Sequence, residues 1–267
     1  MVREKLFLFA GDQKIEHLNQ DFYGKGIPDE CADPEHLFKI ASKGRVGVFA
    51  THLGLIEHYG PDYPEINYLV KLNGKTNLVP TKQKDPISLL LHLVEDVVKF
   101  RDQSRLDKTK LNIYGVGYTI YLGSEFESQM LSQAAQVVYQ AHQHDLKTVL
   151  WIYPRGKAVS DERDPDLIAG AAGVAASLGA DFVKINPPRG KTSEQRATLL
   201  KQAVAAAGRT GVICSGGERV DEKEFLQEIR DQVTIAGAAG CAVGRNIHQR
   251  TLDDAVRLCG EVAKIAL

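Results

Sequence analysis

The chain has 267 residues, of which 43% are hydrophobic and 25% charged, a composition typical of a globular protein. Its formal net charge of -1 and pI near 6.7 exclude the broad positive field by which proteins attract nucleic acid or an anionic membrane, so recognition of phosphate has to be local. No apolar run approaches the roughly 18 residues that a membrane-spanning helix needs, and the four widely separated cysteines, none in a CxxC pair, indicate reduced thiols in a cytoplasmic protein.

Eight short segments, rich in apolar and β-branched residues, have the pattern of buried strands. They tend to end in Gly, Asp, Ser or Asn, the residues that favour turns. The expected strands are, in chain order, 5–12, 46–51, 66–74, 112–120, 147–154, 181–186, 211–217 and 240–245.

The segments between these strands are expected to be mainly helical. Asp33-Pro34 and Asp85-Pro86 each place a capping acid before a proline that suits the first turn of a helix. Apolar or small residues recur at helical spacing in the longer segments. The expected helical segments include 85–100, 124–142, 164–179 and 251–267.

Strand and helix thus alternate eight times, which predicts a parallel sheet because each parallel return needs a crossover. Eight such units in about 250 residues fit a closed (β/α)8 TIM barrel better than an open sheet. No GxGxxG follows the first strand, which weakens a dinucleotide-binding alternative. Residues 73–86 have the composition of a functional or flexible loop. We expect a single α/β domain, a (β/α)8 barrel over residues 1–267.

The expected strand 181–186, "DFVKIN", carries a lysine in its middle. Strand alternation puts Phe182 and Lys184 on one face and Val183 and Ile185 on the other. If the two β-branched residues face the helices, Lys184 points into the barrel mouth, where the reactive side chains of this fold lie. Burial there would lower the lysine pKa from roughly 10.4 toward 7 and leave a neutral amine. Such an amine attacks a carbonyl carbon and forms an iminium, which accepts an electron pair.

Other strand ends supply groups to the same mouth. Trp151 and Tyr153 share one face of the expected strand 147–154, and Asp12 ends the first strand. The same residues permit a structural interpretation, in which Lys184 and Asp12 form an ion pair inside the barrel.

The last two expected strands run into glycine-containing loops, "CSGGERVD" and "AVGRNIHQR". The loops after these two strands, together with a short extra helix, form the usual phosphate site of the fold. Gly216, Gly217 and Gly244 let backbone N–H groups approach an anion closely. Arg245 adds a charge-assisted contact and Ser215 a hydroxyl. The pair of loops therefore predicts phosphate binding.

With these motifs in place, the sequence resembles the archaeal-type class I fructose-bisphosphate aldolases, which are related to deoxyribose-phosphate aldolases. The resemblance implies a Schiff-base aldolase that cleaves or forms a phosphorylated ketose, foremost fructose 1,6-bisphosphate to dihydroxyacetone phosphate and glyceraldehyde 3-phosphate. It implies no metal and no cofactor. The motifs that carry it, in matching order and spacing, are "VGYTIYLGS" at 116–124, "WIYPRG" at 151–156, "DFVKIN", "SGG" and "AVGRNIHQR".

The resemblance also implies residue roles. Lys184 would be the Schiff-base residue, Tyr153 the proton-transferring acid/base, Asp12 the carboxylate at the first strand and Trp151 part of the sugar pocket. It suggests a homo-oligomer, such as a decamer, whose partner is a small sugar phosphate and neither nucleic acid nor membrane. The residues implied to hold the C1 phosphate are Ser215, Gly216, Gly217, Gly244 and Arg245.

Two departures from the family pattern bear on the substrate. After Asp12 this chain reads "DQKIEH", where familiar members have a histidine and a glycine, and the change adds Lys14. After Lys184 the segment "NPPRG" adds Arg189. Both additions are expected near the second half of the sugar or its distal phosphate.

Three alternatives stay open. A related Schiff-base enzyme, a 2-amino-3,7-dideoxy-heptulosonate synthase, would transfer a ketose-phosphate fragment to aspartate semialdehyde. A protein with the same barrel could bind a phosphorylated sugar without catalysis. A zinc-dependent aldolase is disfavoured because the eight histidines form no HExxH motif.

Overall fold

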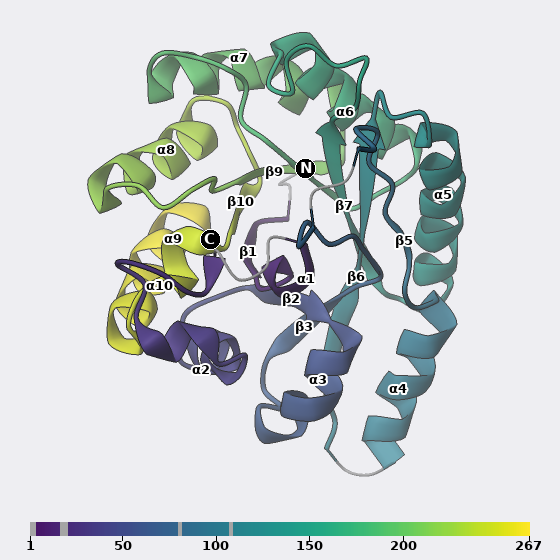
Figure 1. Ribbon diagram of the computed structural model, residues 1–267, viewed down its shortest axis with the longest axis vertical. Coiled ribbons are helices and arrows are strands. Elements are labelled where there is room, and N and C mark those ends of the chain that lie inside the picture. Colours follow the sequence, from purple (N-terminus) through teal and green to yellow (C-terminus); the bar gives the residue numbers. More distant parts are fainter. Residues whose placement is uncertain (1–3, 17–20, 80–81, 107–108) are drawn as a thin grey trace.

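The structure is a computed structural model that describes residues 4–16, 21–79, 82–106 and 109–267. Eight strands close into a barrel in the order β1-β10-β9-β8-β7-β6-β3-β2, and each ladder is parallel (Figure 1). Each overlaps one of the eight predicted strands, which confirms the (β/α)8 barrel. The strands are β1 (Leu6–Ala10), β2 (Val48–His52), β3 (Asn67–Lys71), β6 (Asn112–Leu122), β7 (Lys147–Pro154), β8 (Phe182–Ile185), β9 (Gly211–Ser215) and β10 (Gly240–Val243).

Helices form a layer around the outside of this barrel (Figure 1). Asp33 caps the first of the long helices as predicted, because its Oδ1 accepts the N–H of Glu35 at 2.9 Å. The outer helices are α2 (Glu35–Lys43), α3 (Leu53–Tyr59), α4 (Val94–Leu106), α5 (Glu127–Gln143), α6 (Pro165–Ser177), α7 (Ser193–Ala206), α8 (Glu222–Thr234) and α10 (Leu252–Ala266). Shorter helices are α1 (Gln13–Glu16), α9 (Arg245–His248), η2 (Asp29–Ala32) and η3 (Gly60–Asp62).

The helix predicted over 85–100 is wrong in its first half, since α4 begins later. Leu89–Leu90 instead forms β5, which pairs antiparallel with β4 (Asn73–Gly74). Asp85, the expected helix cap, is buried and places Oδ2 2.9 Å from Lys157 Nζ, while its Oδ1 accepts the Lys157 N–H. Tertiary contacts of Asp85 and the strand pairing therefore override the helical spacing of the leucines.

Two apolar layers lie on either side of the barrel wall. Phe182 and Val149 belong to the cluster that fills the barrel interior, whereas Val183 and Ile185 belong to the cluster between sheet and helices. The predicted alternation of β8 is thereby confirmed, and it leaves Lys184 on the inner face.

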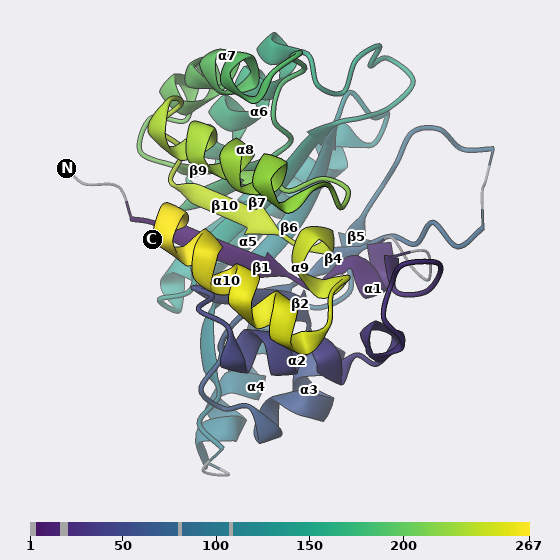
Figure 2. The same ribbon diagram turned by 90° about the vertical axis from the view of Figure 1, so that its left-hand side faces the viewer.

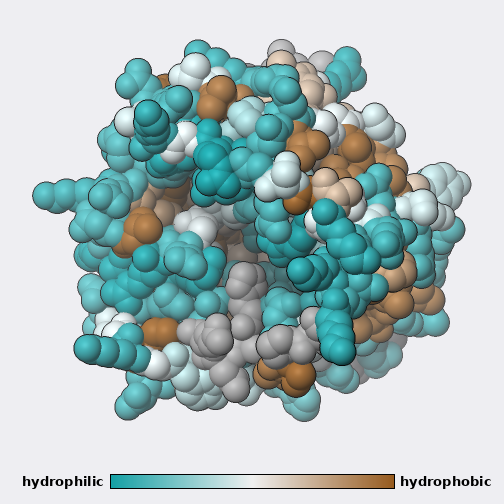
Figure 3. Space-filling view, turned by 45° about the horizontal axis from the view of Figure 1, so that its top comes forward, coloured by the Kyte–Doolittle hydropathy of each residue, from teal (hydrophilic) through white to brown (hydrophobic). Residues whose placement is uncertain are grey.

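The end of the barrel where the strands finish carries additional elements. Figure 2 shows α1, α9 and the β4–β5 hairpin gathered at this end. A space-filling view shows a mostly hydrophilic surface, with hydrophobic residues gathered mainly along one side (Figure 3). None of the helices within the described ranges is both long and apolar enough to cross a membrane.

Candidate active site

A cavity of about 240 Å³ opens at the carboxyl ends of β1, β7, β8, β9 and β10. It brings together eight of the nine residues predicted for the site, which the topology collects from the whole length of the chain. Those eight are Asp12, Tyr153, Lys184, Ser215, Gly216, Gly217, Gly244 and Arg245; Gln13, Glu16, Tyr121, Arg155, Asn186 and Ala242 complete the lining.

Lys184 reaches the cavity from β8 with only 6% of its surface exposed. Burial lowers its pKa below the ordinary lysine value, and the positive charges of Lys71 and Arg245 act in the same direction. The carboxylates of Asp12 and Glu16 oppose this effect. The lowered pKa favours the neutral amine, which is the nucleophilic form.

Trp151, the ninth predicted residue, lies beneath the cavity rather than in its lining. Its indole is 1% exposed, and the Lys184 Nζ lies 5.1 Å from the ring centroid. The strand register places the two residues side by side on β7 and β8. The ring therefore supports the lysine as an apolar and cation–π surface.

A second buried lysine, missed by the sequence analysis, shares that indole. Lys71 ends β3, has no exposed surface and places its Nζ 5.2 Å from the Trp151 ring centroid. This Nζ lies 2.7 Å from Glu16 Oε1, 3.9 Å from Asp12 Oδ2 and 3.2 Å from the Asn73 carbonyl oxygen.

The cation that pairs with these carboxylates is therefore Lys71. Among the described residues Lys184 forms no ion pair, which argues against the structural interpretation of Lys184 with Asp12. The signal for Lys71 was present, because it lies within a predicted strand as Lys184 does.

Tyr153 lies half-buried at the end of β7, opposite Tyr121 on β6. Burial raises the pKa of Tyr153 well above the ordinary tyrosine value, and the charges of Glu16 and Asp12 raise it further. Its hydroxyl is consequently a protonated phenol, able to donate a proton near Lys184.

Arg155 adds a cation beside the two tyrosines. Its guanidinium carbon lies 5.7 Å from the Tyr121 ring centroid and 5.9 Å from that of Tyr153. Glu162 holds it by two hydrogen bonds of 2.9 and 2.8 Å. Of the two cations expected at the distal half of a sugar, neither lines this cavity: Lys14 Nζ donates to the Ala32 carbonyl at 2.6 Å, and Arg189 pairs with Asp161 at 2.7 Å.

The predicted phosphate end is a pair of backbone loops that side chains hold in place. Gly217 adopts φ +65°, a conformation that favours glycine. Arg245 donates from Nε to the Gly217 carbonyl at 3.1 Å. Asn246, missed by the sequence analysis, donates its amide to the Gly216 and Glu218 carbonyls, both at 2.9 Å. The glycine loop is thus fixed in shape before any anion arrives.

Ser215 contributes differently from the glycines. Its hydroxyl donates to Asn186 Oδ1 at 2.6 Å, which ties the end of β9 to the segment after Lys184. His, Cys, Asp and Glu side chains of the described ranges form no group of three that could hold a metal ion.

Comparison with known proteins agrees with this geometry. Residues 6–250 match the DeoC/LacD family aldolase model. A Methanocaldococcus jannaschii protein named fructose-bisphosphate aldolase/6-deoxy-5-ketofructose 1-phosphate synthase is 55% identical over 262 residues, which cover 98% of this chain and 81% of that protein.

Solved structures give the same result. A fructose-bisphosphate aldolase from Slackia heliotrinireducens is 57% identical, with a TM-score of 0.93 over 98% of this chain and 81% of that one. An archaeal fructose-1,6-bisphosphate aldolase, solved with its catalytic lysine bound to the carbinolamine intermediate of the substrate, is 34% identical, with a TM-score of 0.82 over 99% of this chain and 94% of that one. The resemblance inferred from the sequence motifs is confirmed, and the chain belongs to the DeoC/LacD family of aldolases.

Proposed function

We propose that the protein is a class I aldolase that cleaves fructose 1,6-bisphosphate to dihydroxyacetone phosphate and glyceraldehyde 3-phosphate, and joins them in reverse. The observation that carries this proposal is the buried amine of Lys184, which forms no ion pair among the described residues. It faces a cavity that is lined by two glycine loops and an arginine. The names of the three relatives agree with this carbon–carbon lyase activity. None of the three relatives named above is called a heptulosonate synthase, so this alternative is not favoured.

The chemistry begins at the substrate ketone. The Lys184 amine attacks C2, one proton is taken up from solvent, the former carbonyl oxygen leaves as water, and a protonated imine remains. Asp12 accepts the proton of the C4 hydroxyl while the C3–C4 bond breaks. The electron pair of that bond moves into the imine, which becomes an enamine, and C4 leaves as the aldehyde.

The second half of the cycle returns the proton. Tyr153 donates its phenolic proton to C3 of the enamine and restores the imine. Water then hydrolyses the protonated imine, which releases dihydroxyacetone phosphate, the free amine and a proton. Asp12 gives up to solvent the proton that it accepted, and the tyrosine regains one from solvent. The raised pKa of Tyr153 suits this role because it keeps the phenol protonated between turnovers.

The C1 phosphate is held by the glycine loops and Arg245. Anchoring this group fixes C2 in reach of Lys184, so that binding energy from a non-reacting part of the substrate lowers the barrier. Ser215, Gly216, Gly217 and Gly244 form the wall on which the anion would rest.

Lys71 has a positioning role in this scheme. Its ammonium neutralises Glu16 and lies near Asp12, so these acids do not hold Lys184 in its protonated form. The buried cluster thereby supplies the two carboxylates with a cation other than the reacting amine.

Reductive trapping tests the proposal. Incubation with dihydroxyacetone phosphate and borohydride should leave a stable adduct, which peptide mass spectrometry should place on Lys184 and not on Lys71. Lys184→Met should abolish the adduct. An adduct on another residue, or none with the wild-type protein, would refute the Schiff-base scheme.

A second candidate activity uses the same enamine with another acceptor. The name of the Methanocaldococcus jannaschii relative includes 6-deoxy-5-ketofructose 1-phosphate synthase, which favours transfer to a different aldehyde. Product analysis with alternative aldehyde acceptors would separate this transfer from simple reversal of cleavage.

The setting of the enzyme is also part of the proposal. We expect a single-domain protein that works in the cytoplasm as a homo-oligomer. The four cysteines are free and buried, which suits a reducing compartment. Light scattering of the purified protein would measure the number of subunits.

A further inference from the structure

Gln13 is a polar group of the cavity that the scheme above leaves unused. It is the first residue of α1, directly follows Asp12 and lines the cavity with only 8% of its surface exposed. Its Oε1 is buried and accepts no hydrogen bond within the described part of the chain. A buried amide oxygen without a donor is costly, so such a group points to a ligand that supplies one.

The carboxamide lies against the second glycine loop. A Cβ added to Gly244 would meet Gln13 Nε2 at 2.2 Å and Cδ at 3.0 Å. Gly244 therefore leaves room for the glutamine. The amide occupies the wall between this loop, proposed to hold the C1 phosphate, and Asp12, which lies at the reacting end.

The substrate has one hydroxyl that suits this place. When the phosphate rests on the glycine loops and C2 is bonded to Lys184, the hydroxyl on C3 is attached to the next carbon. In dihydroxyacetone phosphate it is the free hydroxyl of the molecule. An alcohol O–H donates readily to an amide oxygen.

We propose that Gln13 is a specificity-determining residue whose Oε1 accepts a hydrogen bond from the C3 hydroxyl of the bound ketose phosphate. The site then prefers ketose 1-phosphates that carry this hydroxyl over analogues with hydrogen at the same carbon. The inference rests on the proposed function and adds a substrate class to it.

A competition between two ketones tests this role. Dihydroxyacetone phosphate and acetonyl phosphate, which lacks only the C3 hydroxyl, are trapped on the wild-type protein with borohydride, and the two adducts are quantified by mass spectrometry. The wild-type protein should favour dihydroxyacetone phosphate about 10-fold to 100-fold, because the analogue leaves a buried acceptor without a donor.

Three variants locate the effect. Gln13→Met and Gln13→Leu replace the carboxamide with an apolar side chain that has no strong acceptor. In both variants the preference for dihydroxyacetone phosphate should fall to about 3-fold or less. Gln13→Glu keeps an acceptor oxygen at the same reach and should retain the preference, although its charge would weaken binding of both phosphorylated ketones. Melting curves identify variants that remain folded.

The outcomes separate the two proposals. A wild-type preference that persists in either folded apolar variant would overturn the role of Gln13 while leaving Schiff-base chemistry intact. Trapping of neither ketone by the wild-type protein would refute the proposed function, and the role of Gln13 with it. Loss of the preference in the apolar variants, with retention in Gln13→Glu, would support it.

Discussion

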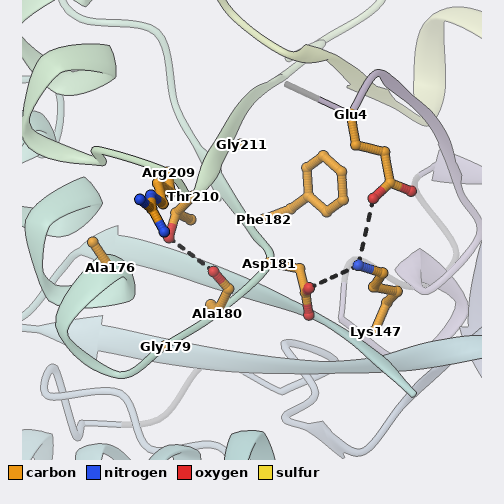
Figure 4. A pocket seen from close by; sticks show the side chains of 10 residues that line it. All are labelled: Glu4, Lys147, Ala176, Gly179, Ala180, Asp181, Phe182, Arg209, Thr210 and Gly211. Atoms are coloured by element: carbon orange, nitrogen blue, oxygen red, sulfur yellow. Dashed lines mark hydrogen bonds and ion pairs between the residues drawn. The ribbon is translucent and has the colours of Figure 1, made fainter. Parts of the chain in front are cut away.

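Titratable side chains lie at both ends of strand β8, and the two ends differ in whether these side chains have partners. Asp181, which directly precedes the strand at the amino end of the barrel, accepts hydrogen bonds from His142 at 2.9 Å, Lys147 at 3.0 Å and both the backbone N–H and hydroxyl of Thr148 at 2.8 and 3.0 Å. Figure 4 shows Lys147 pointing toward Asp181 and Glu4. At the carboxyl end, Lys184 has no ion pair among the described residues and faces a cavity.

The size of a cavity does not distinguish these two ends. The cavity at the amino end measures about 350 Å³, more than the 240 Å³ around Lys184. Three of the four charged residues in its lining are paired, as Lys147 lies between Asp181 and Glu4, and the fourth, Arg209, is exposed to solvent. Polar groups that have hydrogen-bond or ion-pair partners stabilise the barrel. The amine of Lys184, in contrast, lies without an ion pair among the described residues at the end where this fold binds its substrates.

The largest effect is expected from removal of the Lys184 amine. Lys184→Met should lower turnover on the order of 10⁴-fold or more, since no imine can form. The free energy of unfolding should stay equal or rise, because a buried amine without an ion pair among the described residues is replaced by an apolar side chain. Kinetic assays and denaturant titration measure the two effects; a large loss of stability would contradict the assignment.

Tyr153→Phe should separate imine formation from proton transfer. Turnover should fall about 10²-fold to 10⁴-fold, the range for loss of a general acid, while borohydride still traps the ketone on Lys184. Unchanged turnover would remove Tyr153 from its role.

Lys71→Met tests whether the charge of Lys71 keeps the pKa of Lys184 low. Asp12 and Glu16 would then act on Lys184 alone and raise its pKa, so the pH at which imine formation is half-maximal should move upward. Unfolding should also become easier by about 3–5 kcal/mol, the range for breaking a buried ion pair.

The groups that set this pH profile are Asp12, Glu16, Lys71 and Arg245. Lys71→Arg keeps the charge and serves as the control, with a smaller shift expected. A profile identical to that of the wild-type protein in Lys71→Met would contradict the positioning role of Lys71.

Asp181→Asn should give the smallest effect and leave catalysis unchanged. Its hydrogen bonds from His142, Thr148 and Lys147 hold the pKa of Asp181 below the ordinary value despite burial. The carboxylate therefore contributes stability above about pH 3.9, which is lost as the pH falls through the lower folded-state pKa.

The asparagine variant should unfold about 1–3 kcal/mol more easily near neutral pH, with the difference shrinking in acid. Thermal melts across pH measure this, with imine trapping as the control. Loss of trapping in a folded Asp181→Asn would contradict the separation of the two ends.

Much of the fold and site could be predicted because periodicity and strand ends are local signals. The eight strands follow from apolar runs, and the barrel topology then brings Asp12, Tyr153 and Lys184 into one cavity. Lys71 carried the same signal, a lysine within a predicted strand, but it lies in none of the family motifs.

Other features depend on contacts that no local pattern contains. Glu16 lies on the four-residue helix α1, too short for any periodicity, and its partner Lys71 comes from another strand. Gln13 meets Gly244 from the far end of the chain. The leucines after Asp85 have helical spacing, yet strand pairing with Asn73–Gly74 decides their conformation.

The buried cluster at the barrel mouth affects both the free amine of Lys184 and the iminium that forms from it. While the amine of Lys184 is neutral, Lys71, Asp12 and Glu16 together have a formal net charge of one negative unit. Condensation with a ketone creates a cation at that position, and its charge is spread over a larger, less strongly hydrated group than an ammonium. The protein interior thus disfavours the resting ammonium through dehydration yet supplies the counter-charge for the iminium, so the same surroundings that release the nucleophile also retain its product.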